Sequence, residues 1–174
     1  MNNFTLIPII SLNGNCNVPD PSLLDLWYRM CREGKNKTVF YDGFITTGDQ
    51  WIDFMKSPFN YPVVVVGEDK EPHCVAWLNT YENHSARCHF CVLGKYKRGV
   101  GEAIINYWKS MRAGDGSPLL LTIIGITPET NEKAIKFIKM MGFTVLGVIP
   151  HFCNMKYENK LVGGFVSYLC PQGG

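Results

Sequence analysis

Residues 95–111, Lys-Tyr-Lys-Arg-Gly-Val-Gly-Glu-Ala-Ile-Ile-Asn-Tyr-Trp-Lys-Ser-Met, join an apolar run to a helix through a basic loop with two glycines. Four apolar residues after this loop share helical spacing and predict one buried face: Ile104, Ile105, Trp108 and Met111. Gly99 and Gly101 lack Cβ, so the backbone there can turn tightly and approach a ligand. The first N–H groups of a helix are unpaired and partially positive, and three basic residues precede them: Lys95, Lys97 and Arg98. The stretch therefore predicts a phosphate site at the start of this helix.

Two other phosphate motifs are excluded. A P-loop ends in Gly-Lys-Ser/Thr, whereas Gly101 is followed by Glu102 and Ala103. A dinucleotide fingerprint needs a third glycine where this chain has Ile104. Because Gly-x-Gly alone is also typical of ordinary surface loops, the rest of the chain must decide.

The bulk composition predicts one globular domain spanning residues 1–174. A hydrophobic content of 46% with 18% charged residues argues against disorder. The net charge of +2 is too small to indicate a nucleic-acid partner. The apolar runs are too short to span a membrane, and the first residues do not form a signal peptide. We therefore expect a cytoplasmic protein with neither a membrane nor a nucleic acid as partner.

Seven cysteines are scattered without the spacing of a disulfide framework, so we expect them mainly as small buried residues. Cys88-His89-Phe90-Cys91 looks like half of a metal site. It lies in a strand-like run, however, where residues three apart point to opposite faces. The prediction is therefore buried cysteines and no metal.

The order of elements predicts an α/β (α+β) fold: a single mixed, mostly antiparallel sheet of about seven strands, flanked by about four helices. The Tyr61–Gly67 run, with four consecutive valines, is of the buried type found in parallel sheets. The expected strands are residues 4–10, 61–67, 74–81, 87–93, 119–126, 144–148 and 162–169. The expected helices are residues 20–34, 47–58, 101–112 and about 128–142, with loops at 13–19, 35–46 and 150–160.

Two motifs carry a resemblance to the GNAT superfamily of acyl-CoA-dependent N-acetyltransferases. Residues 98–105, Arg-Gly-Val-Gly-Glu-Ala-Ile-Ile, resemble the family's pyrophosphate loop and the helix that follows it. Residues 131–137, Asn-Glu-Lys-Ala-Ile-Lys-Phe, followed by Met141-Gly142-Phe143, resemble its Asn-x-x-Ala helix ending in Gly-Phe. The element order is similar as well, so the resemblance implies a GNAT-like fold over most of the chain.

The resemblance implies acetyl-CoA as co-substrate and a role for each matching residue. Backbone groups of Cys91, Val92 and Leu93 would bond the pantetheine arm where their strand leaves its neighbour. The pyrophosphate would lie on the loop of Lys97, Arg98, Gly99, Val100, Gly101 and Glu102. Asn131 would reach the pantetheine and Phe137 would line its path, although a helix cap and core packing are simpler interpretations of these two residues.

Two positions depart from the family pattern. Tyr96 stands where the family has Arg or Gln, and Ile138 stands where many members carry a tyrosine that protonates the leaving thiolate. The candidate bases are therefore His89, which we rank first, and His151. The candidate acids are Tyr157 and Cys153. A core histidine and ordinary loop residues are the alternative interpretations.

The implied reaction is direct attack of an amine on the acyl thioester, accelerated by alignment and by strand N–H groups at the oxyanion. The alternative function is a catalytically silent protein that binds CoA as a regulatory or interaction module. The acceptor would be an amine of a small molecule or a protein, and the chain is expected to be a monomer or a homodimer.

Overall fold

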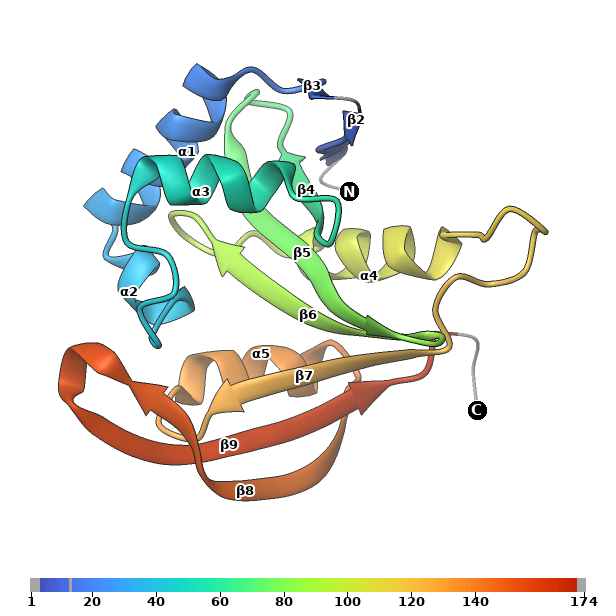
Figure 1. Cartoon of the computed structure of the whole chain (residues 1–174). Helices are drawn as coiled ribbons and strands as arrows, with labels where there is room; N and C mark the ends of the chain where they lie inside the picture. The colour runs from blue at the N-terminus through green and yellow to red at the C-terminus, as the bar shows by residue number, and fades with distance from the viewer. Residues whose placement is uncertain (1–3, 13, 172–174) are drawn as a thin grey trace.

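The computed structural model describes residues 4–12 and 14–171. Seven strands form one sheet in the order β1-β4-β5-β6-β7-β9-β8 (Figure 1). Only the β6–β7 pair is parallel among the described strand pairs, which confirms a mixed, mostly antiparallel sheet. The strands are β1 (Thr5–Pro8), β4 (Tyr61–Val66), β5 (Pro72–Glu82), β6 (Ser85–Val92), β7 (Thr122–Pro128), β8 (Thr144–Met155) and β9 (Lys160–Leu169).

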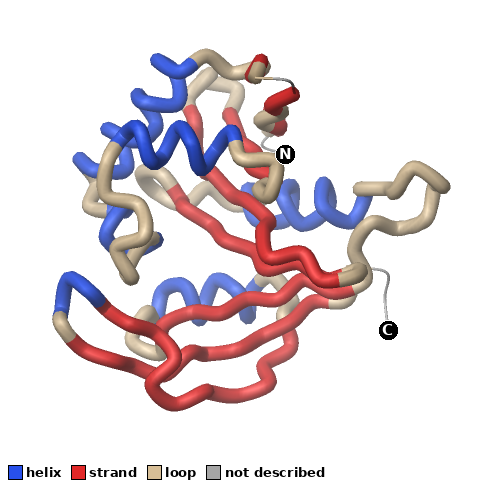
Figure 2. Tube along the Cα trace, in the orientation of Figure 1, coloured by secondary structure: helices blue, strands red, loops and turns tan. Residues whose placement is uncertain are grey.

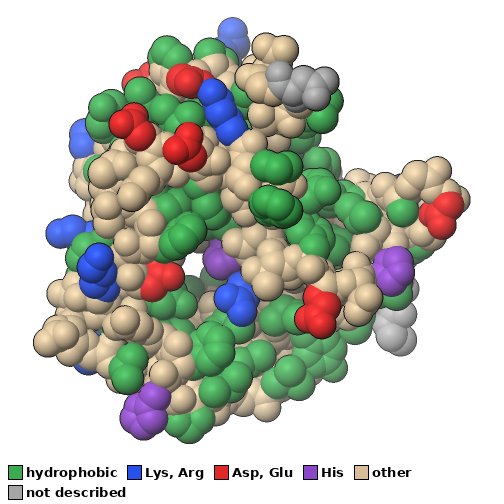
Figure 3. All heavy atoms as spheres, viewed as in Figure 1, with side chains coloured by type: hydrophobic (Ala, Val, Ile, Leu, Met, Phe, Trp, Pro, Cys, Tyr) green, Lys and Arg blue, Asp and Glu red, His purple; other side chains and the backbone are tan. Residues whose placement is uncertain are grey.

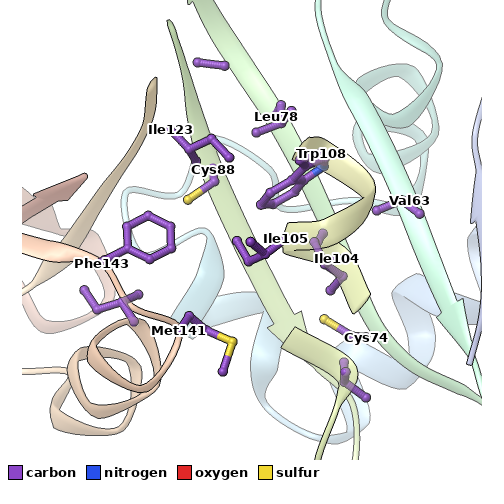
Figure 4. Packing of buried hydrophobic residues seen from close by; sticks show 14 of the residues in the cluster. Val63, Cys74, Leu78, Cys88, Ile104, Ile105, Trp108, Ile123, Met141 and Phe143 are labelled. Atoms are coloured by element: carbon purple, nitrogen blue, oxygen red, sulfur yellow. The ribbon is translucent and has the colours of Figure 1, made fainter. Parts of the chain in front are cut away.

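Helices cover both faces of this sheet (Figures 1 and 2). One face carries α1 (Asp20–Arg32), α2 (Lys35–Val39) and α3 (Gly48–Lys56), and the other carries α4 (Val100–Ser110) and α5 (Glu132–Met140). Strand β5 shows the division, since Cys74 and Ala76 pack toward α4 while Val75 and Trp77 pack toward α1 and α3. Figure 4 shows the α4 side, where Ile104 and Trp108 lie over the strands. The sheet is therefore buried from both sides.

The helix signals in the sequence are confirmed with small shifts. Thr47 and Gln50 form the predicted capping box of α3, with Trp51 and Met55 buried. Helix α1 begins at Asp20, with Pro19 rather than Asp20 in the cap position. Gly34 follows its end in the left-handed conformation, at φ 66°.

Three loop predictions were wrong in part. The predicted loop 35–46 contains α2, a five-residue helix too short to show an apolar period. The predicted loop 13–19 includes β3 (Asn15–Cys16), which pairs with β2 (Ser11–Leu12), while residue 13 lies outside the described residues. The predicted loop 150–160 is mostly strand, because β8 continues to Met155 and a 3-10 turn (Lys156–Glu158) joins it to β9.

The valine run of β4 also differs from expectation, because β4 is antiparallel to both of its neighbours. Its unbroken hydrophobicity has another cause. Val63 and Val65 are buried against the α4 side, and Val64 is buried against α1 and α3. A strand that is covered on both faces needs apolar residues at every position, whatever its direction.

At the opposite edge of the sheet, β8 exposes several apolar side chains: Val145, Leu146, Val148, Ile149 and Phe152. Exposed apolar edge strands favour association, but the expected monomer or homodimer stays a prediction. No helix in residues 4–12 and 14–171 is long and apolar enough to cross a membrane.

Candidate functional site

The sheet divides between its two parallel strands. Register between β6 and β7 covers only Ser85, Ala86 and Arg87 of β6, and the last partner on β7 is Ile124. Beyond this point β6 continues to Val92, still paired with β5, and β7 continues to Pro128, paired with β9. The two strands therefore separate into a fork that opens toward their carboxyl ends.

A pocket of about 680 Å³ occupies this fork. Thr38 and Tyr41 line it from the α2 side, whereas Ala134 and Phe137 line it from α5, on the other side of the sheet. The pocket thus connects the two faces of the molecule. Figure 3 shows the hollow in the middle of the α1–α3 face, with charged and histidine side chains near its edge.

Backbone groups of β6 point into the fork. The N–H of Leu93 donates to the carbonyl of His73 on β5, at 2.9 Å. Because backbone groups alternate between the two edges of a strand, Cys91 also faces β5, while Phe90 and Val92 face the open side. Cys91 and Val92 line the pocket, but Leu93 is fully buried outside its lining. Of the three residues expected to bond a pantetheine, only Val92 offers its N–H there, and Phe90 is an addition.

The two loop glycines serve different purposes. Gly99 is the N-cap of α4 and has φ 96°, which favours glycine. Gly101 is buried, and a Cβ on it would collide with Met141 Sδ and lie 3.0 Å from the Phe137 ring. Gly101 therefore allows α4 and α5 to pack closely, a role that the phosphate interpretation did not foresee.

Tyr96 lies over the start of α4. Its ring packs edge-on against Phe137, with centroids 5.7 Å apart. Burial and the Glu102 carboxylate raise the pKa of the Tyr96 hydroxyl, while a hydrogen bond from the Gly101 N–H acts in the opposite direction. The hydroxyl is therefore at the helix N-terminus, close to the expected pyrophosphate position.

The cations around the loop fall into two groups. Lys97 is held by Asp69, with Nζ 2.7 Å from Oδ2, and it also lies 2.8 Å from Nε2 of His73. The Lys97 ammonium holds the pKa of Asp69 well below its usual range. Lys95 and Arg98 are exposed, and the described residues offer them no ion pair. Further cations, Lys133 and Lys136 of α5, line the pocket.

His89 lines the pocket from β6. Its ring stacks on Trp77 at 5.1 Å, and its Nε2 lies 3.1 Å from Asn79 Oδ1. With Oδ1 as acceptor, Nε2 carries the proton and Nδ1 keeps its lone pair. Burial, and then the charge of Arg87, lower the pKa of His89 to about 4. The imidazole is therefore neutral at neutral pH.

Tyr41 lines the same pocket from the connection between α2 and α3. Its hydroxyl donates to Sγ of the buried Cys153, at 3.5 Å. Burial, and then this hydrogen bond, raise the pKa of Tyr41 far above its usual value. The sequence showed no sign of this pair, because 112 residues separate its members.

A scan against family models found no match, and a search of curated proteins found none either. Among solved structures, the chain is similar to spermidine N-acetyltransferase from Vibrio cholerae in complex with CoA and spermine. The TM-score is 0.70 at 12% identity, and the match covers 97% of this chain and 96% of that one. A protein from Acinetobacter baylyi ADP1, named provisionally as an acetyltransferase, matches with a TM-score of 0.66 at 14% identity, over 98% and 93% of the two chains.

The chain has the GNAT fold. At 12–14% identity the likeness concerns architecture alone, so each residue of the GNAT motifs must be judged by its own surroundings. Asn131 caps α5, its Oδ1 accepting from the Ala134 N–H at 3.2 Å, and it also lines the pocket. Phe137 both packs against the core and lines the pocket.

Of the remaining candidate residues, some line the pocket and others lie away from it. Ile138 is buried and lines the pocket. Tyr157 is 43% exposed, lies beneath the Lys37 ammonium and is not among the described residues that line the pocket. His151 is exposed on β8 with φ 56°, also outside that lining. Cys153 approaches the pocket only through Tyr41.

The prediction of buried cysteines is confirmed for four of the seven, Cys74, Cys88, Cys91 and Cys153, whereas Cys16 is intermediate and Cys31 and Cys170 are exposed. Cys88 is buried on the α4 side of β6 and Cys91 on the α1–α3 side, as expected for residues three apart in a strand. Within the described part of the chain, no group of three or more His, Cys, Asp or Glu residues could hold a metal ion.

Proposed function

We propose that this protein transfers the acetyl group of acetyl-CoA to an amine. The observation that carries the proposal is the pocket through the β6–β7 fork, which is open to both faces of the sheet. Acetyl-CoA would enter from the α4–α5 side and the amine from the α2 side, so that the two reactants meet between the strands. Support for the reaction class comes from the Vibrio cholerae neighbour, an N-acetyltransferase in complex with CoA.

The residues around the fork fit a CoA molecule. The N–H groups of Phe90 and Val92 would donate to the pantetheine amides, so that the pantetheine pairs with β6 as a neighbouring strand would. The amide of Asn131 uses its oxygen as a cap and keeps its NH₂ group as a donor. The phosphates would lie at the start of α4 among Lys95, Arg98 and the lysines of α5. The Tyr96 hydroxyl would donate to a phosphate oxygen in place of the family's Arg or Gln.

The chemical step needs alignment more than strong acids or bases. The amine nitrogen attacks the acetyl carbonyl carbon, the N–C bond forms, and the C–S bond breaks. The nitrogen gives up a proton, and the sulfur leaves as a thiol after taking one. Neutral His89 would accept a hydrogen bond from the amine at Nδ1 and so orient the amine. Because the pKa of His89 is low, water and not His89 would take the proton that the amine loses. The Tyr41 hydroxyl keeps its proton and donates it to Cys153 Sγ, so its oxygen can accept a hydrogen bond from the amine.

Ile138 favours a second candidate function, a CoA-binding module without catalysis. It occupies the pocket position of the family's tyrosine with a side chain that cannot donate a proton. On this alternative, CoA would still bind in the fork.

Two measurements test the proposal together. Calorimetry with CoA and acetyl-CoA measures binding, and release of free thiol from acetyl-CoA with a panel of amines measures transfer. The proposal expects saturable binding and amine-dependent thiol release. Binding without thiol release for any amine supports the silent module instead. Absence of binding by either CoA species contradicts both.

A further inference from the structure

Arg87 stands at the point where the fork begins. It is the last residue of β6 in register with β7, opposite Ile124. Its neighbours Ala86 and Cys88 are buried on the α4 side, so the Arg87 side chain lies on the α1–α3 face with His89. The guanidinium is close enough to affect the pKa values of both His89 and Tyr41. Arg87 is not among the described residues that line the pocket, but it shares the α1–α3 face with His89, two residues along the strand, which does line it.

Arg87 as a residue is partly buried, and no ion pair or side-chain hydrogen bond joins its guanidinium to any residue in 4–12 or 14–171. A guanidinium without a partner in the protein keeps its donors for a ligand that supplies an anion. Among the described residues, no other group nearby neutralises the positive charge of Arg87. Asp42 is exposed, and its Oδ1 already accepts from the Phe44 N–H at 3.0 Å.

The pocket itself is cationic. Its charged lining residues are Lys35, Lys133 and Lys136, with no aspartate or glutamate among the described residues that line it. With Lys133 and Lys136 beside the CoA phosphates, Lys35 of α2 and the nearby Arg87 remain on the acceptor side, and both would repel a polycation such as spermine. A group with negative charge would be attracted.

We propose that Arg87 binds a carboxylate of the acceptor, and that the acceptor is therefore an amine that also carries a carboxylate, such as an amino acid. This inference rests on the proposed acetyl transfer. The guanidinium holds the carboxylate through two parallel hydrogen bonds. The amine then lies beside Nδ1 of His89 and faces the thioester in the fork.

Matched pairs of acceptors that differ only by a carboxylate test the proposal. The pairs are L-ornithine and putrescine, L-lysine and cadaverine, and L-phenylalanine and phenethylamine. In the thiol-release assay, wild-type kcat/KM is expected to be higher for the amino acid of each pair by about tenfold or more. Arg87→Gln should reduce that ratio to about one, mainly through KM. Arg87→Lys should keep part of the preference, and Lys109→Gln, a charge removed from the far end of α4, should keep all of it.

A binding measurement separates this proposal from the proposed function. Thermal unfolding of the CoA-loaded protein is followed with each member of the pairs, and stabilisation by the amino acids that is lost in Arg87→Gln supports the carboxylate site even without turnover. Preference for the diamines, or an unchanged ratio in a folded Arg87→Gln protein that still binds CoA, overturns it. Thiol release with diamines alone would leave acetyl transfer standing and reject Arg87 as the carboxylate site.

Discussion

His89 illustrates how its surroundings decide the chemistry of one side chain. The sequence places it on a strand near the expected thioester, which suggests a general base. The structure buries the ring against Trp77 and lowers the pKa of His89 to about 4. A base this weak holds almost no protons at neutral pH, so the role proposed for His89 is to accept a hydrogen bond at Nδ1 and not to remove a proton.

Acid should therefore destabilise the fold through His89. The pKa of an unfolded histidine is near 6.5, so the unfolded state takes up the proton first as the pH falls. The stability due to neutral His89 is complete above about pH 6.5 and is lost as the pH falls toward 4. Between pH 7 and pH 4.5, urea unfolding should show a loss about 2 kcal/mol larger in wild type than in His89→Gln. Equal losses in the two proteins would contradict the low pKa.

Asn131 has two assigned roles that substitution can separate. Asn131→Asp keeps an oxygen to cap α5 but removes the NH₂ donor, so stability should hold while CoA affinity falls about fivefold. Asn131→Ala removes both and should also lose about 1 kcal/mol of stability. Urea unfolding and calorimetry with CoA measure the two effects. If Asn131→Asp binds CoA like wild type, Asn131 is only a helix cap.

Residues with a local signature could be predicted from the sequence, whereas residues defined by distant neighbours could not. Asn131 precedes its own helix, so its role as a cap could be predicted, and its place in a motif gave the second role, which stays a proposal. Arg87 looked like an ordinary strand residue, because its position at the fork depends on where the pairing with β7 ends. Tyr41 acquires its environment from Cys153 on β8.

At the scale of elements, α3 is the part whose sequence signal and structure agree best. Its capping box positions Trp51 and Phe54 against Trp77, which in turn supports His89. Thr47→Ala should lower the free energy of unfolding by about 1 kcal/mol, because the Gln50 N–H loses its acceptor. Thr47→Ser keeps the hydroxyl and should lose much less. A similar loss for both substitutions in urea unfolding would show that the cap is not the cause.

The loop before α4 should bind phosphate through the two cations that have no ion pair among the described residues, Lys95 and Arg98, of which Arg98 is next to the helix start. Arg98 is exposed and unpaired within the described chain, whereas Lys97 is occupied by Asp69. Arg98→Gln should weaken CoA binding about fivefold at low salt, the size of an exposed ion pair, and less at high salt. Lys109→Gln serves as the control for removal of one positive charge. Calorimetry at two ionic strengths measures both, and an Arg98→Gln affinity equal to that of the control would place the phosphates elsewhere.

The sequence could not predict elements that lack a regular spacing of apolar residues or a residue that marks where they end. Helix α2 has five residues, fewer than two turns. The second half of β8 follows a register shift between Ile149 and Cys153, where the left-handed His151 interrupts the alternation. This region begins with Pro150 and was expected to be a loop, but pairing with β9 makes most of it strand.

At the scale of the whole molecule, two hydrophobic clusters share one sheet. The cluster under α4 and the cluster under α1 and α3 both use side chains from β4, β5 and β6. Neither cluster can lose these strands without exposing the other. We therefore expect residues 1–174 to unfold as one domain, although the fork divides the sheet.

Calorimetry tests this expectation directly. A single transition whose calorimetric enthalpy equals the van't Hoff enthalpy is the expected result. Addition of CoA should raise the midpoint of that one transition, because a ligand that binds only the folded state stabilises the whole cooperative unit. Two resolved transitions, or a shift confined to part of the melting curve, would show that the two sides of the fork unfold separately.

The stacking of His89 on Trp77 also equips the protein with an optical signal. An imidazolium against an indole quenches its fluorescence, whereas a neutral imidazole does so much less. Emission should therefore fall as His89 titrates near pH 4, and His89→Gln should remove this step. Because the same ring lines the pocket, an incoming acceptor would change the emission of Trp77. Entry of the second reactant could then be followed in stopped-flow experiments without any label.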